Sequence, residues 1–149
     1  MPEEEKLNVL VVGNNPIELG RVFQSLEAIP GKDIITEIAF DLKSIVERLG
    51  KFTPTFILLD DNLGKIELKE IVQALLKFRK TRSVPITVLK NSNYVAIINS
   101  GVMNYILKKD ITGESLYQAF KSSLKFRKTQ RYLLNAYRKR KKQVQRLLR

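Results

Sequence analysis

Three residue types that support much of protein chemistry are missing from this 149-residue chain. The absence of Cys excludes disulfides, thiolate metal sites and cysteine nucleophiles. The absence of His excludes histidine-based triads, most transition-metal sites and a phosphohistidine on this chain. Trp is absent as well, and every apolar run is far too short to span a membrane. Because the N-terminus also lacks the pattern of a signal peptide, we expect a cytoplasmic protein without membrane contact.

Acidic residues are missing from one part of the chain only. Residues 120–149 contain 12 Lys and Arg and no acid, whereas residues 1–119 contain 15 basic and 15 acidic residues. The net charge of +12 therefore belongs entirely to the last 30 residues. Charge asymmetry of this kind indicates a neutral domain followed by an interaction segment.

The rest of the chain alternates short apolar runs with amphipathic segments. The apolar runs predict five strands, over 7–12, 33–40, 55–59, 84–89 and 104–107. The segments between and after them predict helices over 16–29, 41–49, 66–79, 94–99 and from 112 to the C-terminus. Five βα units of this length predict an α/β flavodoxin-like fold with a doubly wound parallel sheet and a long C-terminal helix.

Polar side chains follow the predicted strands at their carboxyl ends, where ligands bind in sheets of this type. Gly13 and Asn14 follow the first strand, Asp60 ends the third, and Lys90 and Lys108 follow the fourth and fifth. The glycines after the first strand do not make a dinucleotide-binding motif, and a phosphate-binding P-loop is absent. We therefore expect no enzymatic activity and no organic cofactor.

These residues resemble the receiver domain of response regulators in two-component signalling. The order of the matching segments carries the resemblance: 9–12, 15–16, 56–60, 84–89 and 104–108. It implies the strand order 2-1-3-4-5 and a histidine kinase or another signalling protein as partner. It also implies that Asp60 is the phosphoacceptor, that Lys108 contacts the phosphoryl group, and that Tyr105 is the switch aromatic.

Two parts of the family pattern are missing. Gly13 and Asn14 stand where receivers carry an acidic pair, and Lys90 stands where they carry a hydroxyl side chain. Mg²⁺ prefers carboxylate ligands, so Asp60 alone is expected to give at most a weak metal site. We therefore hypothesise that Asp60, Lys90 and Lys108 form an internal ion cluster in place of the metal. The plainer alternatives are that Lys90 points to solvent and that Tyr105 only packs.

The sequence divides into a receiver-like domain over 1–126 and a basic helical extension over 127–149. Apolar residues recur in the extension at alternating spacings of four and three, a weak coiled-coil pattern. Three interpretations of the extension remain open: a homodimer or another helix-to-helix contact, nucleic-acid binding, and a solvated segment without a partner. The basic residues expected to take part are Lys128, Arg131, Arg138, Arg140 and Lys141.

The sequence thus predicts an atypical receiver domain that acts by protein contact, with weak or no Mg²⁺-dependent phosphorylation at Asp60. One alternative is a receiver that still accepts a phosphoryl group at that residue. Another is an adaptor that binds nucleic acid through the basic extension.

Overall fold

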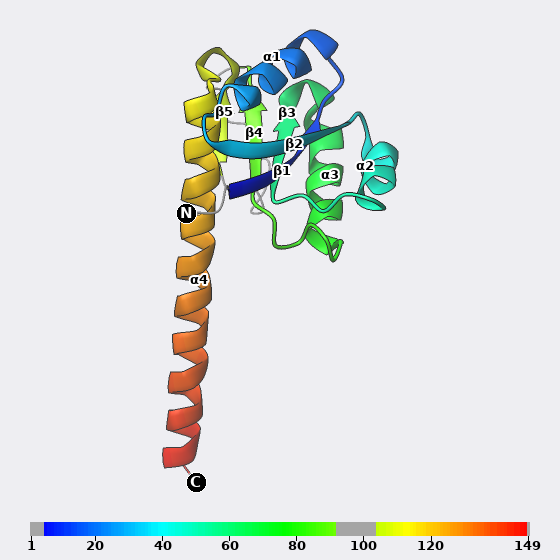
Figure 1. Ribbon diagram of the computed structural model, residues 1–149. Coiled ribbons are helices and arrows are strands. Elements are labelled where there is room, and N and C mark those ends of the chain that lie inside the picture. The colour runs from blue at the N-terminus through cyan, green and yellow to red at the C-terminus, as the bar shows by residue number, and fades with distance from the viewer. Residues whose placement is uncertain (1–4, 92–103, 149) are drawn as a thin grey trace.

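The computed structural model describes residues 5–91 and 104–148 and contains one five-stranded parallel sheet (Figure 1). The strands follow one another in space in the order β2-β1-β3-β4-β5, which confirms the predicted flavodoxin-like fold. Their bounds are β1 Glu5–Val12, β2 Lys32–Ala39, β3 Phe56–Asp60, β4 Ile86–Lys90 and β5 Asn104–Leu107. Each helical connection within the described residues returns the chain to the same edge of the sheet, as parallel pairing requires.

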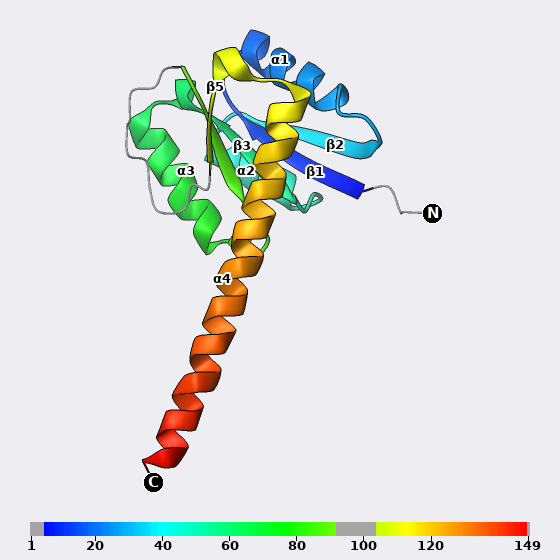
Figure 2. The ribbon, with the colours of Figure 1, turned by 90° about the vertical axis from the view of Figure 1, so that its left-hand side faces the viewer.

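Helices cover both faces of the sheet (Figures 1 and 2). Helices α1 and α4 pack on one face, and α2 and α3 pack on the other. Their bounds are α1 Pro16–Glu27, α2 Leu42–Leu49, α3 Lys65–Lys77 and α4 Gly113–Leu147, with 3₁₀ turns at Asp61–Leu63 and Lys108–Asp110. The short helix expected over 94–99 lies outside the described residues.

Side-chain caps fix where three of these helices begin. The Asn15 side chain accepts hydrogen bonds from the first backbone amides of α1, which starts at Pro16. Asp41 and Thr112 form reciprocal capping boxes at the starts of α2 and α4. Because the four N-terminal amides of a helix have no partner within it, such caps stabilise the start by about 1 kcal/mol each.

The core lies in two apolar layers separated by the sheet. One layer joins β1, β3 and β4 to α2 and α3, and the other joins the opposite face of the same strands to α1 and α4. In the second layer the rings of Phe56 and Phe120 meet edge to face with their centroids 5.3 Å apart. This contact fixes the first half of α4 against the sheet.

Gly113 allows the start of α4 to approach α1 closely. A Cβ atom at this position would lie 2.7 Å from the backbone oxygen of Ser25 and 3.1 Å from the side chain of Ile29. Only glycine therefore fits here without moving one of the two helices. The close approach brings the β5–α4 loop beside α1, next to the carboxyl edge of the sheet.

Helix α4 continues well beyond the sheet as a single uninterrupted helix (Figures 1 and 2). Its first half buries Leu116, Phe120 and Ser123 against the domain, whereas residues 128–148 are exposed throughout. The predicted long C-terminal helix is therefore present. No helix in the described parts of the chain is long and apolar enough to cross a membrane.

Candidate functional site

The carboxyl edge of the sheet brings together side chains from three strands because their ends are in register. Val12 pairs with Leu59, Asp60 pairs with Leu89, and Lys90 pairs with Leu107. The residues after β1, at the end of β3 and after β5 therefore meet at one place. It is the predicted position of the site.

Asp60 is the buried centre of this edge. Its side chain is only 1% exposed, although it ends a strand that opens into a turn. Its Oδ1 atom accepts a hydrogen bond from the backbone amide of Asn62 at 2.8 Å, which caps the 3₁₀ turn that follows β3. Among the described residues its Oδ2 atom has no hydrogen-bond partner. One carboxylate oxygen is thus fixed, and the other is buried without a donor.

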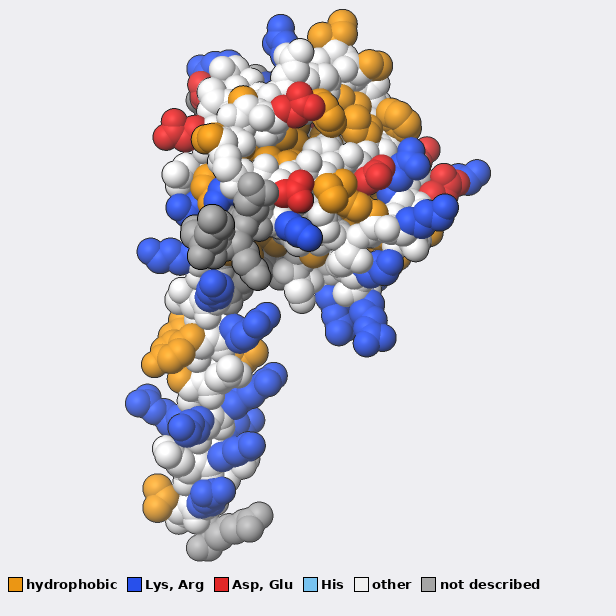
Figure 3. Space-filling model, viewed as in Figure 1, with side chains coloured by type: hydrophobic (Ala, Val, Ile, Leu, Met, Phe, Trp, Pro, Cys, Tyr) orange, Lys and Arg blue, Asp and Glu red, His pale blue; other side chains and the backbone are white. Residues whose placement is uncertain are grey.

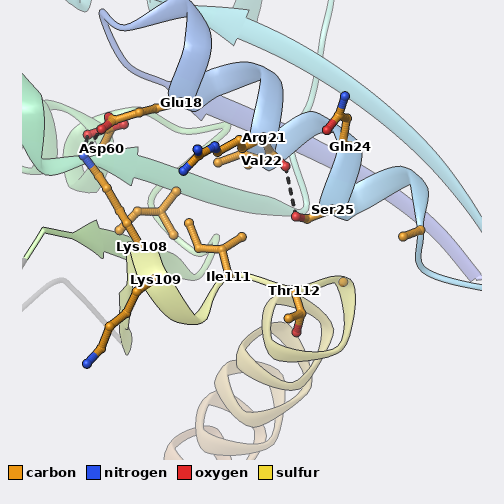
Figure 4. A pocket seen from close by; sticks show the side chains of 13 residues that line it. Glu18, Arg21, Val22, Gln24, Ser25, Asp60, Lys108, Lys109, Ile111 and Thr112 are labelled. Carbon is orange, nitrogen blue, oxygen red and sulfur yellow. Dashed lines mark hydrogen bonds and ion pairs between the residues drawn. The ribbon is translucent and has the colours of Figure 1, made fainter.

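Lys108 binds three carboxylates at once, and Figure 4 shows two of them, Asp60 and Glu18. Its ammonium nitrogen lies 2.6 Å from Oδ1 of Asp60, 2.8 Å from Oε2 of Glu18 and 3.3 Å from Oδ1 of Asp61. Glu18 comes from the first turn of α1, and Asp61 opens the turn after β3. We call these four residues the Lys108 cluster.

The cluster perturbs the proton affinity of its members in opposite directions. Burial raises the pKa of Asp60 above 3.8, and the neighbouring Glu18 carboxyl adds to that effect, against the opposing contact with Lys108. The hydrogen bond from Lys108 lowers the pKa of Glu18 below 4.5. Burial alone would lower the pKa of Lys108, but its bonds to Asp60 and Glu18 raise it above 10.5. The lysine is therefore firmly protonated and faces an excess of negative charge.

Asparagine side chains complete the surroundings of the cluster. Asn62 donates to Oε2 of Glu18 at 2.5 Å, and Asn91 donates to Oδ1 of Asp61 at 2.9 Å. Asn14 donates to the backbone oxygen of Asn62 at 3.4 Å, so its side chain turns toward the loop rather than toward Asp60. These amides anchor the carboxylates that Lys108 holds.

The sequence hypothesis of an ion cluster is wrong in one member. Lys90 does not reach Asp60, because its ammonium nitrogen lies 4.8 Å over the centre of the Tyr105 ring. Asp60 pairs with Leu89, so the two side chains point to the face of α1 and α4, and Lys90 points to the other face. Tyr105 is 42% exposed and is a partner of Lys90 at the surface.

The sequence interpretation also missed two members of the cluster. Asp61 follows the last residue of β3, where strand alternation would turn its side chain away from Asp60, but it opens a 3₁₀ turn and reaches Lys108. Glu18 was not considered. Its signal was its place three residues after the Asn15 cap, where the first turn of α1 faces the carboxyl edge.

Gly13 lies directly over Asp60, in a space that α1 has filled. A Cβ atom at position 13 would lie 2.8 Å from Cδ2 of Leu19 and 3.1 Å from Cβ of Asp60. Leu19 therefore packs against the glycine, and a larger side chain at position 13 would require the Leu19 side chain to move.

A cavity of about 540 Å³ opens beside the cluster, between α1 and the β5–α4 loop (Figure 4). Arg21, Val22 and Ser25 line it from α1, and Ile111 and Thr112 line it from the loop. Asp60 and Lys108 also line this cavity, so it adjoins the Lys108 cluster.

Comparisons with known proteins agree with this architecture. No family model matches the chain. The nitrate/nitrite response regulator protein NarP of Escherichia coli (strain K12) is 29% identical over 139 residues, which are 92% of this chain and 64% of NarP. The chain therefore spans just under two thirds of that relative.

Two solved structures extend the likeness to three dimensions. The N-terminal domain of a response regulator receiver protein from Methanoculleus marisnigri JR1 matches with a TM-score of 0.57 and 26% identity, over 78% of this chain and 94% of that one. The receiver domain of the sensor histidine kinase PA1611 from Pseudomonas aeruginosa PAO1, solved with magnesium in its active-site cleft, matches with a TM-score of 0.65 and 16% identity, over 78% of this chain and 96% of that one.

The chain is thus similar to response regulator receiver domains in sequence and in fold. The resemblance implies that Asp60 stands at the phosphoacceptor position and Lys108 at the lysine position, and these roles stay predictions.

The residues at the carboxyl edge of the sheet do not fit a magnesium site of the usual kind. Glycine and an outward-turned asparagine replace the acidic pair, and the Lys108 ammonium already lies among the remaining carboxylates. In the described ranges, no group of three or more acidic side chains is arranged to hold a metal ion. We therefore assign no step to a metal here, and a weak Mg²⁺ site at Asp60 stays a prediction.

Proposed function

We propose that this receiver domain signals by protein contact from a single resting state that the Lys108 cluster maintains without a metal. The observation that carries the proposal is the position of one ammonium between three carboxylates, at 2.6 to 3.3 Å. In this arrangement the lysine supplies the positive charge that a divalent cation would otherwise bring to Asp60. We also propose that the chain catalyses no reaction.

The partner class follows from the relationship to NarP, a nitrate/nitrite response regulator. We propose a histidine kinase or another signalling protein as the partner. The cavity between α1 and the β5–α4 loop supports this proposal, because it joins an apolar wall of Val22 and Ile111 to the polar Arg21 beside the cluster. A mixed surface of this kind suits a protein partner.

One observation favours a second candidate function, in which Asp60 still accepts a phosphoryl group. The Oδ2 atom of Asp60 is buried and has no donor among the described residues, and Asp60 is one of the residues that line the cavity. A free oxygen on a carboxylate is what an incoming phosphoryl group needs. Slow, metal-independent transfer is the form this function would take, since transfer depends on charge neutralisation around the phosphoryl oxygens.

Beryllofluoride separates the two candidates, because it mimics a phosphoryl group on an aspartate. The ¹⁵N–¹H spectrum of the full chain is recorded with Mg²⁺ alone, with beryllofluoride alone and with both. Relative to the spectrum without additives, we expect no chemical-shift change of the Asp61 and Asn62 amides under any of these three conditions. Shifts that require Mg²⁺ and vanish in Asp60→Asn would overturn the proposal, and shifts with beryllofluoride alone would establish the second candidate.

A further inference from the structure

The face of α4 that packs on the domain continues beyond the domain in the same register. Leu116, Ala119 and Ser123 are buried against the sheet and follow one another at spacings of three and four. The next positions in this series, from 130 onward, extend along the exposed part of the helix. The same face of α4 is thus buried against the domain in the first half of the helix and uncovered in the second half.

Apolar side chains occupy most of this continued face. Leu133, Tyr137, Val144 and Leu147 lie on it, and their exposed fractions range from 49% to 83%. Leu148 lies next to it and is 81% exposed. Side chains of this size are rarely left in water as a continuous stripe, which indicates an interaction surface. We call the face formed by 130, 133, 137, 140, 144 and 147 the α4 seam.

In the heptad register, most of the positive charge lies off the seam, and Figure 3 shows how many Lys and Arg side chains the exposed part of α4 carries. In heptad terms the seam holds the a and d positions, and the positions on one of its flanks, 129, 136 and 143, are Thr, Ala and Gln. Most basic residues lie on the outward positions b, c and f: Lys125, Lys128, Arg131, Arg138, Lys139, Lys142 and Arg146. The charges thus leave the apolar surface accessible to a second helix.

The separation of the apolar seam from the basic positions decides which kind of partner fits the exposed part of α4. A nucleic acid would neutralise the outward bases but would leave Leu133, Tyr137 and Val144 exposed to water. A second α4 covers those side chains, and the uncharged flank places no like charges directly across it. The absence of any acid after Glu114 means that no salt bridge within α4 offsets the repulsion along a single helix.

We propose that the exposed part of α4 binds the same part of a second copy of the chain, as a two-stranded coiled coil along the α4 seam. The pairing does not depend on the chemistry of Asp60. It leaves most of the basic positions of both helices on the outside of the pair, where salt screens them. Arg140 is the one charged residue in the seam and opposes the pairing.

Analytical ultracentrifugation of the full chain tests the proposal. We expect twice the chain mass at high protein concentration, with a dissociation constant that falls as salt rises, because salt screens the outward bases. The double substitution Leu133→Lys with Val144→Lys should abolish the dimer. Tyr132→Lys is the matched control, since Tyr132 is 73% exposed on the same turn but lies off the seam, and it should leave the dimer intact.

A variant that should strengthen the dimer shows whether a loss of dimer in the other variants is due to misfolding. Arg140→Leu should lower the dissociation constant, because it removes the charge from the seam. Circular dichroism of every variant must show the helix content of the unaltered chain. A monomer at every salt and protein concentration would overturn the proposal, as would an equal effect of Tyr132→Lys. Monomers that bind duplex DNA with affinity that falls steeply with salt would assign the surface to nucleic acid instead.

Discussion

Replacing Lys108 by methionine removes the only positive charge that the described residues place in the cluster. Methionine keeps the length and apolar stem of the side chain, so the change isolates the ammonium. The carboxylates of Asp60, Glu18 and Asp61 then face one another without a counter-charge in a partly buried site. The folded state should lose stability for this reason alone.

The structure sets the size of the loss. Removing one partner of a buried ion pair costs about 3–5 kcal/mol. Here Asp60 is fully buried and Lys108 is 14% exposed, but the Glu18 and Asp61 side chains are 28% and 23% exposed and keep part of their hydration. We therefore expect Lys108→Met to lower the free energy of unfolding by about 3 kcal/mol.

Urea unfolding at neutral pH measures this loss, and two further variants interpret it. Lys109→Met is the control, because Lys109 is exposed and bonds to no acid among the described residues; it should change stability by about 0.5 kcal/mol or less. Adding Asp60→Asn to Lys108→Met should recover about 1–2 kcal/mol, since it removes the buried charge that the lysine no longer balances. The reasoning is refuted if Lys108→Met costs no more than Lys109→Met, or if Asp60→Asn brings no recovery.

Three other outcomes follow from the same site. Gly13→Ala should destabilise the fold by about 1–3 kcal/mol in urea unfolding, because its methyl group would lie 2.8 Å from the core side chain of Leu19. Gly20→Ala is its control: a Cβ atom there has no neighbour within 4 Å, so the change should stabilise α1 by about 0.5–1 kcal/mol. The folded-state pKa of Glu18 lies below 4.5, so its carboxylate stabilises the fold above pH 4.5, and this stabilisation is lost as the pH falls through the folded-state pKa. Over the same acid range, Glu18→Gln should lose less of its free energy of unfolding than the unaltered chain. Lys90→Met should cost about 0.5–1 kcal/mol and leave the NMR signals of the Asp60 region unmoved, as expected for a contact with Tyr105 alone.

Local patterns were sufficient to predict the fold. Short apolar runs ended by polar turns predicted the strands, and the amphipathic segments between them predicted the helices. Each of these signals lies within a few residues of the element that it defines. The strand order came from the resemblance to receiver domains, and the pairing of β1 with both β2 and β3 confirms it.

The site could be predicted only in part, because its contacts join distant segments. Asp60 and Lys108 were found since both end strands at one edge. Glu18 was missed, since the sequence does not tell how closely the first turn of α1 approaches β3. Lys90 was misplaced because the hypothesis considered its distance along the chain and not the alternation of β4, which points it away from Asp60.

The packing of Leu19 over Gly13 also affects the order in which this sequence can acquire mutations. An acid introduced at position 13 alone meets a filled space, and a smaller residue introduced at position 19 alone leaves a cavity in the α1 layer of the core. Each change is harmful by itself, and only the pair restores both volume and charge. Positions 13 and 19 are therefore coupled, and the stability effects of changes at the two positions should not be additive.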